Sequence, residues 1–439
     1  MEELARLMRE LEDQLVVCMK CGMCQSVCPV FDQTGREADV ARGKLALLGG
    51  LMESMFDDPE GVNQRLNKCL LCGSCAANCP SGVSVQEIFL KARAILTGYM
   101  GLSPAKRLIL KGMLANPKIF DCLTEWGARF QKLFTRPVND IVGTSCARVM
   151  SPLIQDRHFH TLAKTPFHKQ IPSLDKPAGK SNLKVAIFTG CLIDKLFPSI
   201  AHATLQVLDY CGVGVYMPEG QGCCGIPALS SGDLPTFRKL LAHNLALFAA
   251  GDFDVLVTSC ATCTSTIHEV WPTMADEKNR EAAKRLADRT MDINQFLIKE
   301  AGLKPLAGKN ENPRTVTYHD PCHLKKSLGV FTEPRAVIDA APGYRLKEMV
   351  EPDWCCGMGG SFNLQYYEIS KGIGRKKAAH IMETGAEVLA TGCPACMIQI
   401  SDLLSRAGAR IAVRHPVELI AESLSIKSEV ASSSPAKKS

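Results

Sequence analysis

The spacing of the cysteines constrains the fold of this 439-residue chain more than any other feature. Most of the 21 cysteines fall into repeated patterns, and such spaced thiols either bind metal or form disulfides. The chain starts with charged residues, and no apolar stretch reaches the roughly 18 residues of a membrane span, so neither an export signal nor a membrane helix is predicted. Because disulfides are not expected without export, we interpret the grouped cysteines as metal ligands or redox centres of a cytoplasmic protein.

Two runs share the spacing C-x2-C-x2-C-x3-C and are each followed by proline, Pro29 and Pro80. This spacing is typical of cubane [4Fe–4S] sites in which the fourth cysteine ligates the other cluster of a pair. The first cubane set is therefore predicted to be Cys18, Cys21, Cys24 and Cys79, and the second cubane set Cys69, Cys72, Cys75 and Cys28. The alternative is a pair of structural zinc sites. It is disfavoured because the run occurs in two complete copies, each followed by proline.

Apolar residues around both runs recur at helical spacing, as in the series Leu4, Leu7, Met8, Leu11, Leu15 and the series Val40, Ala41, Leu45, Leu48, Met52. Ser84 and Glu87 match a capping box at the start of a further helix. We therefore predict an α-helical ferredoxin domain over residues 1–98.

The remaining grouped cysteines form an internal duplication. Each copy contains a single cysteine, a Cys-Cys-Gly triplet and a C-x2-C pair, and the second copy follows the first by 131 to 133 positions. The first quintet is Cys191, Cys223, Cys224, Cys260 and Cys263, and the second quintet is Cys322, Cys355, Cys356, Cys393 and Cys396.

Short apolar segments at 184–189, 254–259, 315–320 and 387–392 precede cysteines of both quintets and predict buried strands. Open α/β sheets bind ligands beyond the carboxyl ends of their strands, which is where these cysteines would lie. Gly225 and Gly357 permit close backbone approach at the two Cys-Cys turns, and the second turn is glycine-rich enough to donate N–H groups to sulfur. The chain is thus predicted to be multidomain, with α/β CCG domains at 183–305 and 313–425 after a basic helical connector at 99–182, and with a disordered tail at 426–439.

The duplicated pattern resembles the cysteine-rich CCG module of heterodisulfide reductase B subunits, and the helical ferredoxin domain resembles that of heterodisulfide reductases and succinate dehydrogenases. Fused on one chain, the two modules resemble the iron–sulfur subunit family of bacterial glycolate oxidase and D-lactate dehydrogenase over about residues 10–425. The resemblance implies that one or both quintets bind a noncubane [4Fe–4S] cluster, with zinc as the alternative occupant.

The chain has no flavin or nicotinamide fingerprint and no nucleophile–base pattern, so we predict no catalytic residue. We expect an electron-transfer subunit of an oxidoreductase complex. The resemblance implies an FAD-containing partner that oxidises glycolate or D-lactate, with electrons passing to quinone or another carrier. The alternatives are a heterodisulfide-reductase-like catalytic subunit, the C-type iron–sulfur component of an anaerobic glycerol-3-phosphate dehydrogenase, and a zinc-holding assembly scaffold.

The net charge of +6 is concentrated in residues 99–182, which carry a net +8, whereas residues 1–98 carry a net −3. No aromatic–basic interleaving or recognised module accompanies this charge, so nucleic-acid binding is not expected. Prolines in the segment predict interrupted helices. A solvated connector between domains is the favoured interpretation. The sharper alternative is contact with an acidic partner or with anionic lipid, which would place the protein peripherally on the cytoplasmic face of the inner membrane.

Two smaller groups of residues receive structural interpretations. Cys122, Cys146 and Cys211 belong to no pattern and are predicted to be buried as small apolar side chains. His319, Asp320 and His323 flank Cys322, where structural hydrogen bonding is favoured over proton transfer.

Overall fold

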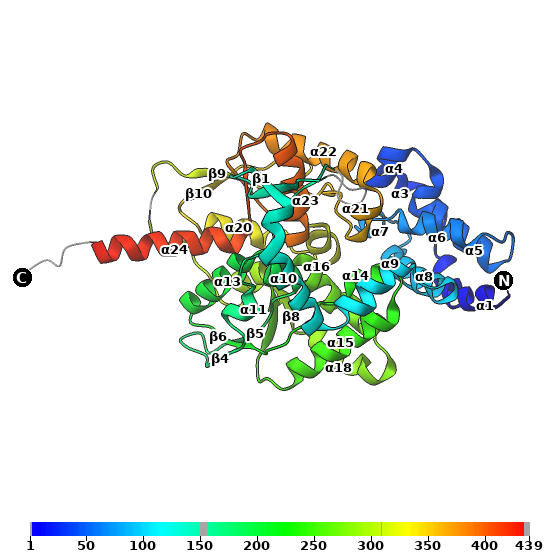
Figure 1. Cartoon of the computed structure of the whole chain (residues 1–439), viewed down its shortest axis with the longest axis horizontal. Coiled ribbons are helices and arrows are strands. Elements are labelled where there is room, and N and C mark those ends of the chain that lie inside the picture. The colour runs from blue at the N-terminus through cyan, green and yellow to red at the C-terminus, as the bar shows by residue number, and fades with distance from the viewer. Residues whose placement is uncertain (1, 150–155, 309, 434–439) are drawn as a thin grey trace, which may run out of the picture.

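The computed structural model describes residues 2–149, 156–308 and 310–433. Figure 1 shows small N-terminal helices at one end of the molecule, two sheet-containing domains beside them, and the end of the last helix projecting at the opposite side. The prediction of a multidomain chain with two α/β domains is confirmed. Among the described residues, every helix is too short or too polar to cross a bilayer.

Residues 2–100 form only helices and loops. The helices are α1 (Glu2–Met8), α2 (Glu12–Leu15), α3 (Met23–Ser26), α4 (Pro29–Thr34), α5 (Ala41–Met52), α6 (Pro59–Asn67), α7 (Ser74–Ala77) and α8 (Val85–Met100), with 3-10 turns at Arg9–Leu11 and Glu37–Asp39. Leu4, Leu48 and Phe89 bring α1, α5 and α8 into one apolar core. The helix α8 begins after Ser84 as predicted, but the predicted capping box is wrong: the Ser84 side chain makes no capping hydrogen bond, and Glu87 Oε1 accepts a hydrogen bond from Gln14 Nε2 at 3.2 Å.

The connector contains more regular structure than its prolines suggest. Helices α9 (Pro104–Arg107) and α10 (Pro117–Phe134) flank a π-helical turn at Leu108–Leu114. The prediction of interrupted helices is wrong for α10, because Pro117 occupies the first turn, where no backbone N–H is needed. The chain then forms an antiparallel sheet of β1 (Thr135–Asn139), β2 (Thr144–Ala147) and β3 (His158–Phe159), so the connector is not purely helical. These strands are short and lack the apolar alternation that would have predicted them.

The first α/β domain is built on a five-stranded sheet in the order β4-β6-β5-β7-β8. The strands are β4 (Leu174–Lys176), β5 (Lys184–Phe188), β6 (Gly214–Met217), β7 (Val255–Thr258) and β8 (Thr290–Asp292). The surrounding helices are α11 (Phe167–Gln170), α12 (Cys191–Lys195), α13 (Pro198–Cys211), α14 (Ile226–Ser230), α15 (Leu234–Ala249), α16 (Ala261–Ser265), α17 (Trp271–Met274), α18 (Glu277–Ala287) and α19 (Ile293–Lys299), with a π-helical turn at Thr266–Val270. Only β4 is antiparallel to its neighbour, and it extends this sheet into the segment predicted to be connector.

The second α/β domain has a fully parallel sheet in the order β10-β9-β11-β12. The strands are β9 (Arg314–Tyr318), β10 (Tyr344–Leu346), β11 (Val388–Ala390) and β12 (Ala412–Arg414). The helices are α20 (Glu333–Asp339), α21 (Ser361–Gln365), α22 (Tyr367–Glu383), α23 (Pro394–Arg406) and α24 (Pro416–Ser433), with a π-helical turn at His323–Ser327. This order repeats β6-β5-β7-β8 of the first domain, and the four predicted strands correspond to β5, β7, β9 and β11. The duplication in the sequence is therefore a duplication of fold.

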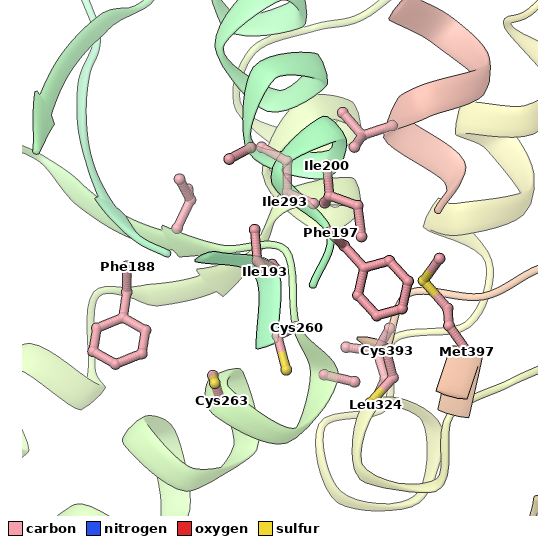
Figure 2. Close-up of a cluster of buried hydrophobic side chains, with 14 of the residues drawn as sticks. Phe188, Ile193, Phe197, Ile200, Cys260, Cys263, Ile293, Leu324, Cys393 and Met397 are labelled. Carbon is pink, nitrogen blue, oxygen red and sulfur yellow. The ribbon is translucent and has the colours of Figure 1, made fainter. Parts of the chain in front are cut away.

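The two α/β domains share one apolar core rather than meeting across a polar gap. Helix α24 of the second domain packs on α13 of the first. Ala261 N donates a hydrogen bond to Gly392 O at 3.0 Å, which joins the two C-x2-C segments. Figure 2 shows Cys260 and Cys263 of the first domain in the same apolar cluster as Cys393 of the second.

Two further expectations need correction. The tail at 426–439 is not disordered over 426–433, where α24 continues, and 434–439 lie outside the described residues. Of the ungrouped cysteines, Cys211 is buried as predicted, Cys146 is half-buried, and Cys122 is exposed. The prediction fails for Cys122 because it lies on the solvent face of α10.

Candidate iron–sulfur centres

The two cubane runs have the same backbone conformation. Lys20 and Leu71 lie at equivalent positions and both have left-handed φ angles, of 59° and 55°. Gly22 and Gly73 follow with φ angles of 87° and 73° and begin α3 and α7. Left-handed residues in a tight turn can direct backbone N–H groups toward one concave side, which favours an anion. The backbone of each run is therefore shaped for a negatively charged thiolate cluster.

The structure brings the cubane cysteines together in the mixed sets predicted from spacing. One cavity is lined by Cys28 with Cys69, Cys72 and Cys75. A second cavity is lined by Cys18, Cys21, Cys24 and Cys79, and Cys75 borders it too. Cys28 reaches the second run because it caps α4, where its thiol accepts a hydrogen bond from Phe31 N at 3.5 Å. Each cavity offers four sulfur donors, a donor set that suits an iron–sulfur cluster.

Buried cations surround the second cubane set. Lys44 lines the cavity and donates its Nζ hydrogen bond to Asp39 O, while burial lowers the pKa of its ammonium group. Arg93 is buried behind Cys69 and donates from Nη2 to Cys69 O at 2.9 Å and from Nη1 to Ser230 O at 2.8 Å. Positive charges at this depth offset the negative charge of grouped thiolates. Arg93 also ties the ferredoxin domain to the first α/β domain.

The five thiols of the first quintet form a continuous row. Cys191 Sγ lies 3.7 Å from Cys223 Sγ, and Cys223 contacts Cys224. Cys224 then contacts Cys263, which contacts Cys260. Cys223 and Cys263 both donate to the Cys224 sulfur, which lowers the pKa of Cys224 well below its ordinary value. The thiolate is the form that ligates metal, so Cys224 is the thiol of this row that most readily takes that form. Neighbouring thiols and burial instead raise the pKa of Cys223, Cys260 and Cys263.

The second quintet repeats this row in the same order. Cys322 contacts Cys355, and Cys355 contacts Cys356. Cys356 Sγ lies 3.4 Å from Cys396 Sγ, and Cys396 contacts Cys393. Hydrogen bonds from its two neighbours again lower the pKa of the central thiol, Cys356.

A histidine accompanies the second quintet only. Potential ligand atoms of His319, Cys356 and Cys396 lie within 4.8 Å of one another. Burial lowers the pKa of His319 to about 3, so the ring is neutral and able to bind metal. Phe188 stands at the equivalent place in the first domain. Because the first copy has no histidine at this position, the duplication did not predict His319 as a possible ligand. In the sequence it was noted only because it lies close to Cys322.

Glycine is required at both Cys-Cys-Gly turns. Gly225 and Gly357 have left-handed φ angles of 93° and 90°. A Cβ on Gly225 would lie 2.7 Å from Phe237 Cδ2, and a Cβ on Gly357 would lie 2.5 Å from Ser370 O. Gly357 N also donates a hydrogen bond to Cys355 Sγ at 3.4 Å, as the glycine-rich turn predicted.

The two quintets meet at the boundary between the α/β domains. The Cys260 thiol contacts the Cys393 thiol of the other domain. Thr262 Oγ1 lies 3.4 Å from Cys393 Sγ and 3.2 Å from His323 Nδ1. His323 Nε2 lies 3.3 Å from Leu71 O of the ferredoxin domain. His323 therefore links three domains.

The second cubane set meets the second quintet in the same region. The Cys72 thiol contacts the Cys355 thiol, and this contact together with burial raises the pKa of Cys72. The surrounding apolar cluster includes Val30, Leu70, Phe362 and Ile373. Gly359 makes the approach sterically feasible, because a Cβ there would lie 2.5 Å from Leu70 Cδ2.

Asp320 next to Cys322 has a structural role. Arg335 holds this buried carboxylate with two hydrogen bonds, from Nη1 to Oδ1 at 2.7 Å and from Nη2 to Oδ2 at 3.1 Å. Lys325 Nζ adds an ion pair at 3.5 Å. A carboxylate so fully paired is fixed in place, which supports the interpretation made from the sequence.

Comparison with known proteins agrees with this architecture. A family described as 4Fe-4S dicluster domain matches residues 14–83. A family described as cysteine-rich domain matches twice, at residues 185–268 and 316–401. The chain is therefore a multidomain iron–sulfur protein with one dicluster domain and two cysteine-rich domains.

The chain is similar in sequence to several iron–sulfur and lactate-utilization proteins. The probable glycolate oxidase iron–sulfur subunit of Bacillus subtilis is 28% identical over 435 residues, which cover 94% of each chain. Lactate utilization protein A of Halalkalibacterium halodurans is 31% identical over 239 residues, 54% of this chain and 96% of that protein. The B chain of the fumarate reductase (CoM/CoB) of Methanothermobacter marburgensis is 29% identical over 401 residues, 89% of this chain and 68% of that protein. The chain belongs to the family of oxidoreductase iron–sulfur subunits that includes these proteins.

Proposed function

We propose that the chain is the electron-transfer subunit of a flavin-dependent 2-hydroxy-acid dehydrogenase complex, in which a partner FAD subunit oxidises glycolate or D-lactate. The observation that carries the proposal is the continuous row of thiols from Cys72 through the second quintet to Cys191. The names of the glycolate and lactate relatives support the substrate class. The two cubane sets would hold [4Fe–4S] cubanes and each quintet a noncubane [4Fe–4S] cluster, groups that supply one-electron transfer when bound.

The first cubane set, which precedes the row, is more exposed than the end of the row at Cys191, and this difference supports a direction of electron flow. Cys21 of the first cubane set is exposed, and Val16 (75%), Met19 (66%) and Met23 (53%) present apolar side chains to solvent around it. Exposed apolar patches mark protein interfaces, and methionine adapts readily to a partner surface. We place the docking site of the FAD subunit here. Electrons would leave near Cys191, at the other end, toward a quinone or another carrier.

The proposal is tested by anaerobic purification with any co-purifying flavoprotein, followed by metal analysis and by reduction with glycolate, D-lactate, L-lactate or glycerol 3-phosphate. Four filled [4Fe–4S] sites give about 16 Fe per chain, and the ferredoxin pair alone about 8. We expect the higher value and reduction by glycolate or D-lactate. The proposal fails if zinc fills the quintets, or if no flavoprotein co-purifies and no hydroxy acid reduces the protein.

The order of sites is tested with two cysteine variants, using freeze-quench electron paramagnetic resonance after substrate addition. Cys355→Ser is expected to stop electrons before the first quintet, whereas Cys191→Ser leaves the second quintet reducible. Cys122→Ser is the matched control, because this cysteine is exposed and belongs to no set. Unchanged reduction of the first quintet in Cys355→Ser would contradict the order.

A further inference from the structure

Helix α10 presents a broad apolar face to solvent. None of its 18 residues is buried, and Leu123, Trp126 and Leu133 are 47%, 65% and 67% exposed. Trp126 and Phe130 pair with ring centroids 5.1 Å apart. The exposed large apolar residues of the helix are Ile119, Leu123, Trp126, Phe130, Leu133 and Phe134. At 3.6 residues per turn these side chains share one face.

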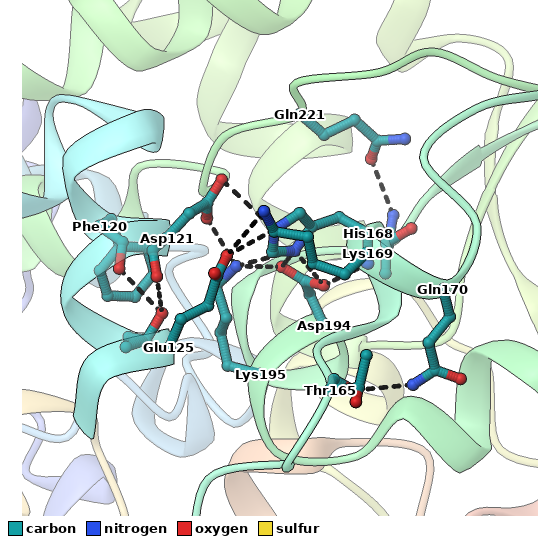
Figure 3. Close-up of polar contacts among 12 residues, drawn as sticks. Phe120, Asp121, Glu125, Thr165, His168, Lys169, Gln170, Asp194, Lys195 and Gln221 are labelled. Atoms are coloured by element: carbon teal, nitrogen blue, oxygen red, sulfur yellow. Dashed lines mark hydrogen bonds and ion pairs between the residues drawn. The ribbon is translucent and has the colours of Figure 1, made fainter. Parts of the chain in front are cut away.

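The two acidic residues of α10 point the other way, toward the first α/β domain (Figure 3). Asp121 Oδ1 lies 2.6 Å from the Nζ of Lys195, which is only 4% exposed. Glu125 Oε1 lies 3.4 Å from His168 Nε2 and 3.5 Å from Lys169 Nζ. The negative charges of the helix are therefore neutralised on its inner side, and they hold it to α11 and α12.

The exposed charges around the outer face are mostly positive, with Asp140 of the hairpin as a negative exception. Lys118, Arg129 and Lys132 are the basic residues of α10, and all three are exposed. The flanking turn and hairpin add further exposed apolar and basic side chains: Leu108, Ile109, Lys111, Arg136, Val138 and Ile141. An apolar helix face that carries tryptophan, phenylalanine and leucine beside lysine and arginine fits the interfacial layer of an anionic bilayer.

We propose that the outer face of α10 lies in the surface layer of a membrane that contains anionic lipid. A protein partner is the less fitting occupant, because the exposed charges around the face are predominantly positive and suit a uniformly negative surface. Attachment of this kind is parallel to the membrane and needs no spanning helix.

The attachment would lie beside the first quintet. Helix α12 begins at Cys191 and ends at Lys195, the residue that pairs with α10. At the same, N-terminal end of α10, Pro117 Cγ lies 3.5 Å from the position of a Cβ on Gly222, next to Cys223. If the proposed function holds, a lipid-soluble acceptor would reach the exit end of the thiol row here. The attachment itself does not depend on that function.

The test uses the full-length protein, purified anaerobically, and vesicles of phosphatidylcholine with 30 mol% phosphatidylglycerol, compared with pure phosphatidylcholine vesicles. We expect co-sedimentation with the anionic vesicles to be at least tenfold stronger, and to fall at least tenfold in the variant Leu123→Ser/Phe130→Ser/Leu133→Ser. The charge variant Lys118→Glu/Arg129→Glu/Lys132→Glu leaves the apolar face intact and is expected to lose a similar factor. Trp126 fluorescence is expected to shift to shorter wavelength on binding, and Trp126→Phe removes the shift.

Two control variants change equally exposed residues elsewhere. Val350→Ser/Leu364→Ser/Met382→Ser removes other exposed apolar side chains, and Lys278→Glu/Arg280→Glu/Lys284→Glu reverses charge on α18. Both are expected to bind like wild type. The proposal is overturned if wild type does not bind anionic vesicles, or if the α10 variants bind as well as the controls. Loss of the co-purifying flavoprotein in the α10 variants, without vesicle binding by wild type, would assign the face to a protein partner. Because no substrate is used, a failure here leaves the proposed electron transfer untouched.

Discussion

Replacing Gly357 with alanine tests whether the Cys-Cys-Gly turn of the second quintet depends on the absence of a side chain. The residue has a φ angle of 90°, and a Cβ would lie 2.5 Å from Ser370 O. The obstacle is backbone in α22, and Ser370 Oγ also donates a hydrogen bond to Gly357 O at 2.7 Å. The turn therefore has to move away from α22, and Cys355 and Cys356 move with it.

The expected loss of stability in Gly357→Ala has two parts, which a control variant separates. A left-handed conformation costs an alanine about 1–2 kcal/mol, and forced displacement in a packed region adds about 1–3 kcal/mol. Gly408 has a φ angle of 69° with nothing within 4 Å of its Cβ position, so Gly408→Ala bears only the first cost. We therefore expect Gly357→Ala to be less stable than Gly408→Ala by about 1–3 kcal/mol.

The assay combines anaerobic urea unfolding with iron analysis of the purified variants. If the proposed clusters are present, Gly357→Ala is expected to lose iron from the second quintet alone, and to retain about 12 of 16 Fe per chain. Gly408→Ala should keep the wild-type iron content. Equal stability and equal iron content in the two variants would refute the steric argument.

Two further substitutions are expected to change the free energy of unfolding in a defined way. Arg93→Met deprives three carbonyl oxygens of a buried charged donor, those of Leu66, Cys69 and Ser230, and is expected to lower the free energy of unfolding by about 3–6 kcal/mol in urea titrations. Lys91→Met, which removes a half-exposed ion pair, should lower it by less than about 1 kcal/mol. Equal losses in the two variants would contradict the bridging role of Arg93. Burial raises the pKa of Asp292 to about 7, and its Oδ2 has no hydrogen-bond partner among the described residues. The carboxyl group of Asp292 loses its proton near pH 4 in the unfolded chain and near pH 7 in the folded chain. Its contribution to the free energy of unfolding is therefore complete below about pH 4 and declines as the pH rises to about 7. We therefore expect wild type to lose about 4 kcal/mol over this range relative to Asp292→Asn, and parallel pH profiles of the two proteins would show the argument to be wrong.

The local chemistry of the sites was predictable from the sequence because it depends on residues close together in the chain. The spacing of the cubane runs indicated that Cys28 joins the second run and Cys79 the first, and the cavities contain these combinations. The strands before the quintets and the glycines at their turns were predictable in the same way. The strands and the turns are determined by residues close together in the chain, whereas the exchange of Cys28 and Cys79 between the runs was indicated by the known behaviour of this cysteine spacing.

Features that depend on packing between distant segments gave no such signal. Nothing in the sequence paired Cys72 with Cys355 or Cys260 with Cys393, since these contacts follow from how whole domains dock. The connector was misjudged because a proline in the first turn of a helix looks, in sequence, like a proline that interrupts one. Cys122 was misjudged because a lone cysteine was expected to be buried as a small apolar side chain, whereas this one lies on the solvent face of α10.

Gly359 makes the two copies of the duplicated domain unequal. Its counterpart in the first copy is Pro227, whose ring would stand where Leu70 now packs. Exchanging the order of the two copies along the chain would therefore leave each fold intact and still prevent the ferredoxin domain from docking. The third residue after the paired cysteines therefore determines which copy of the domain can contact the ferredoxin domain.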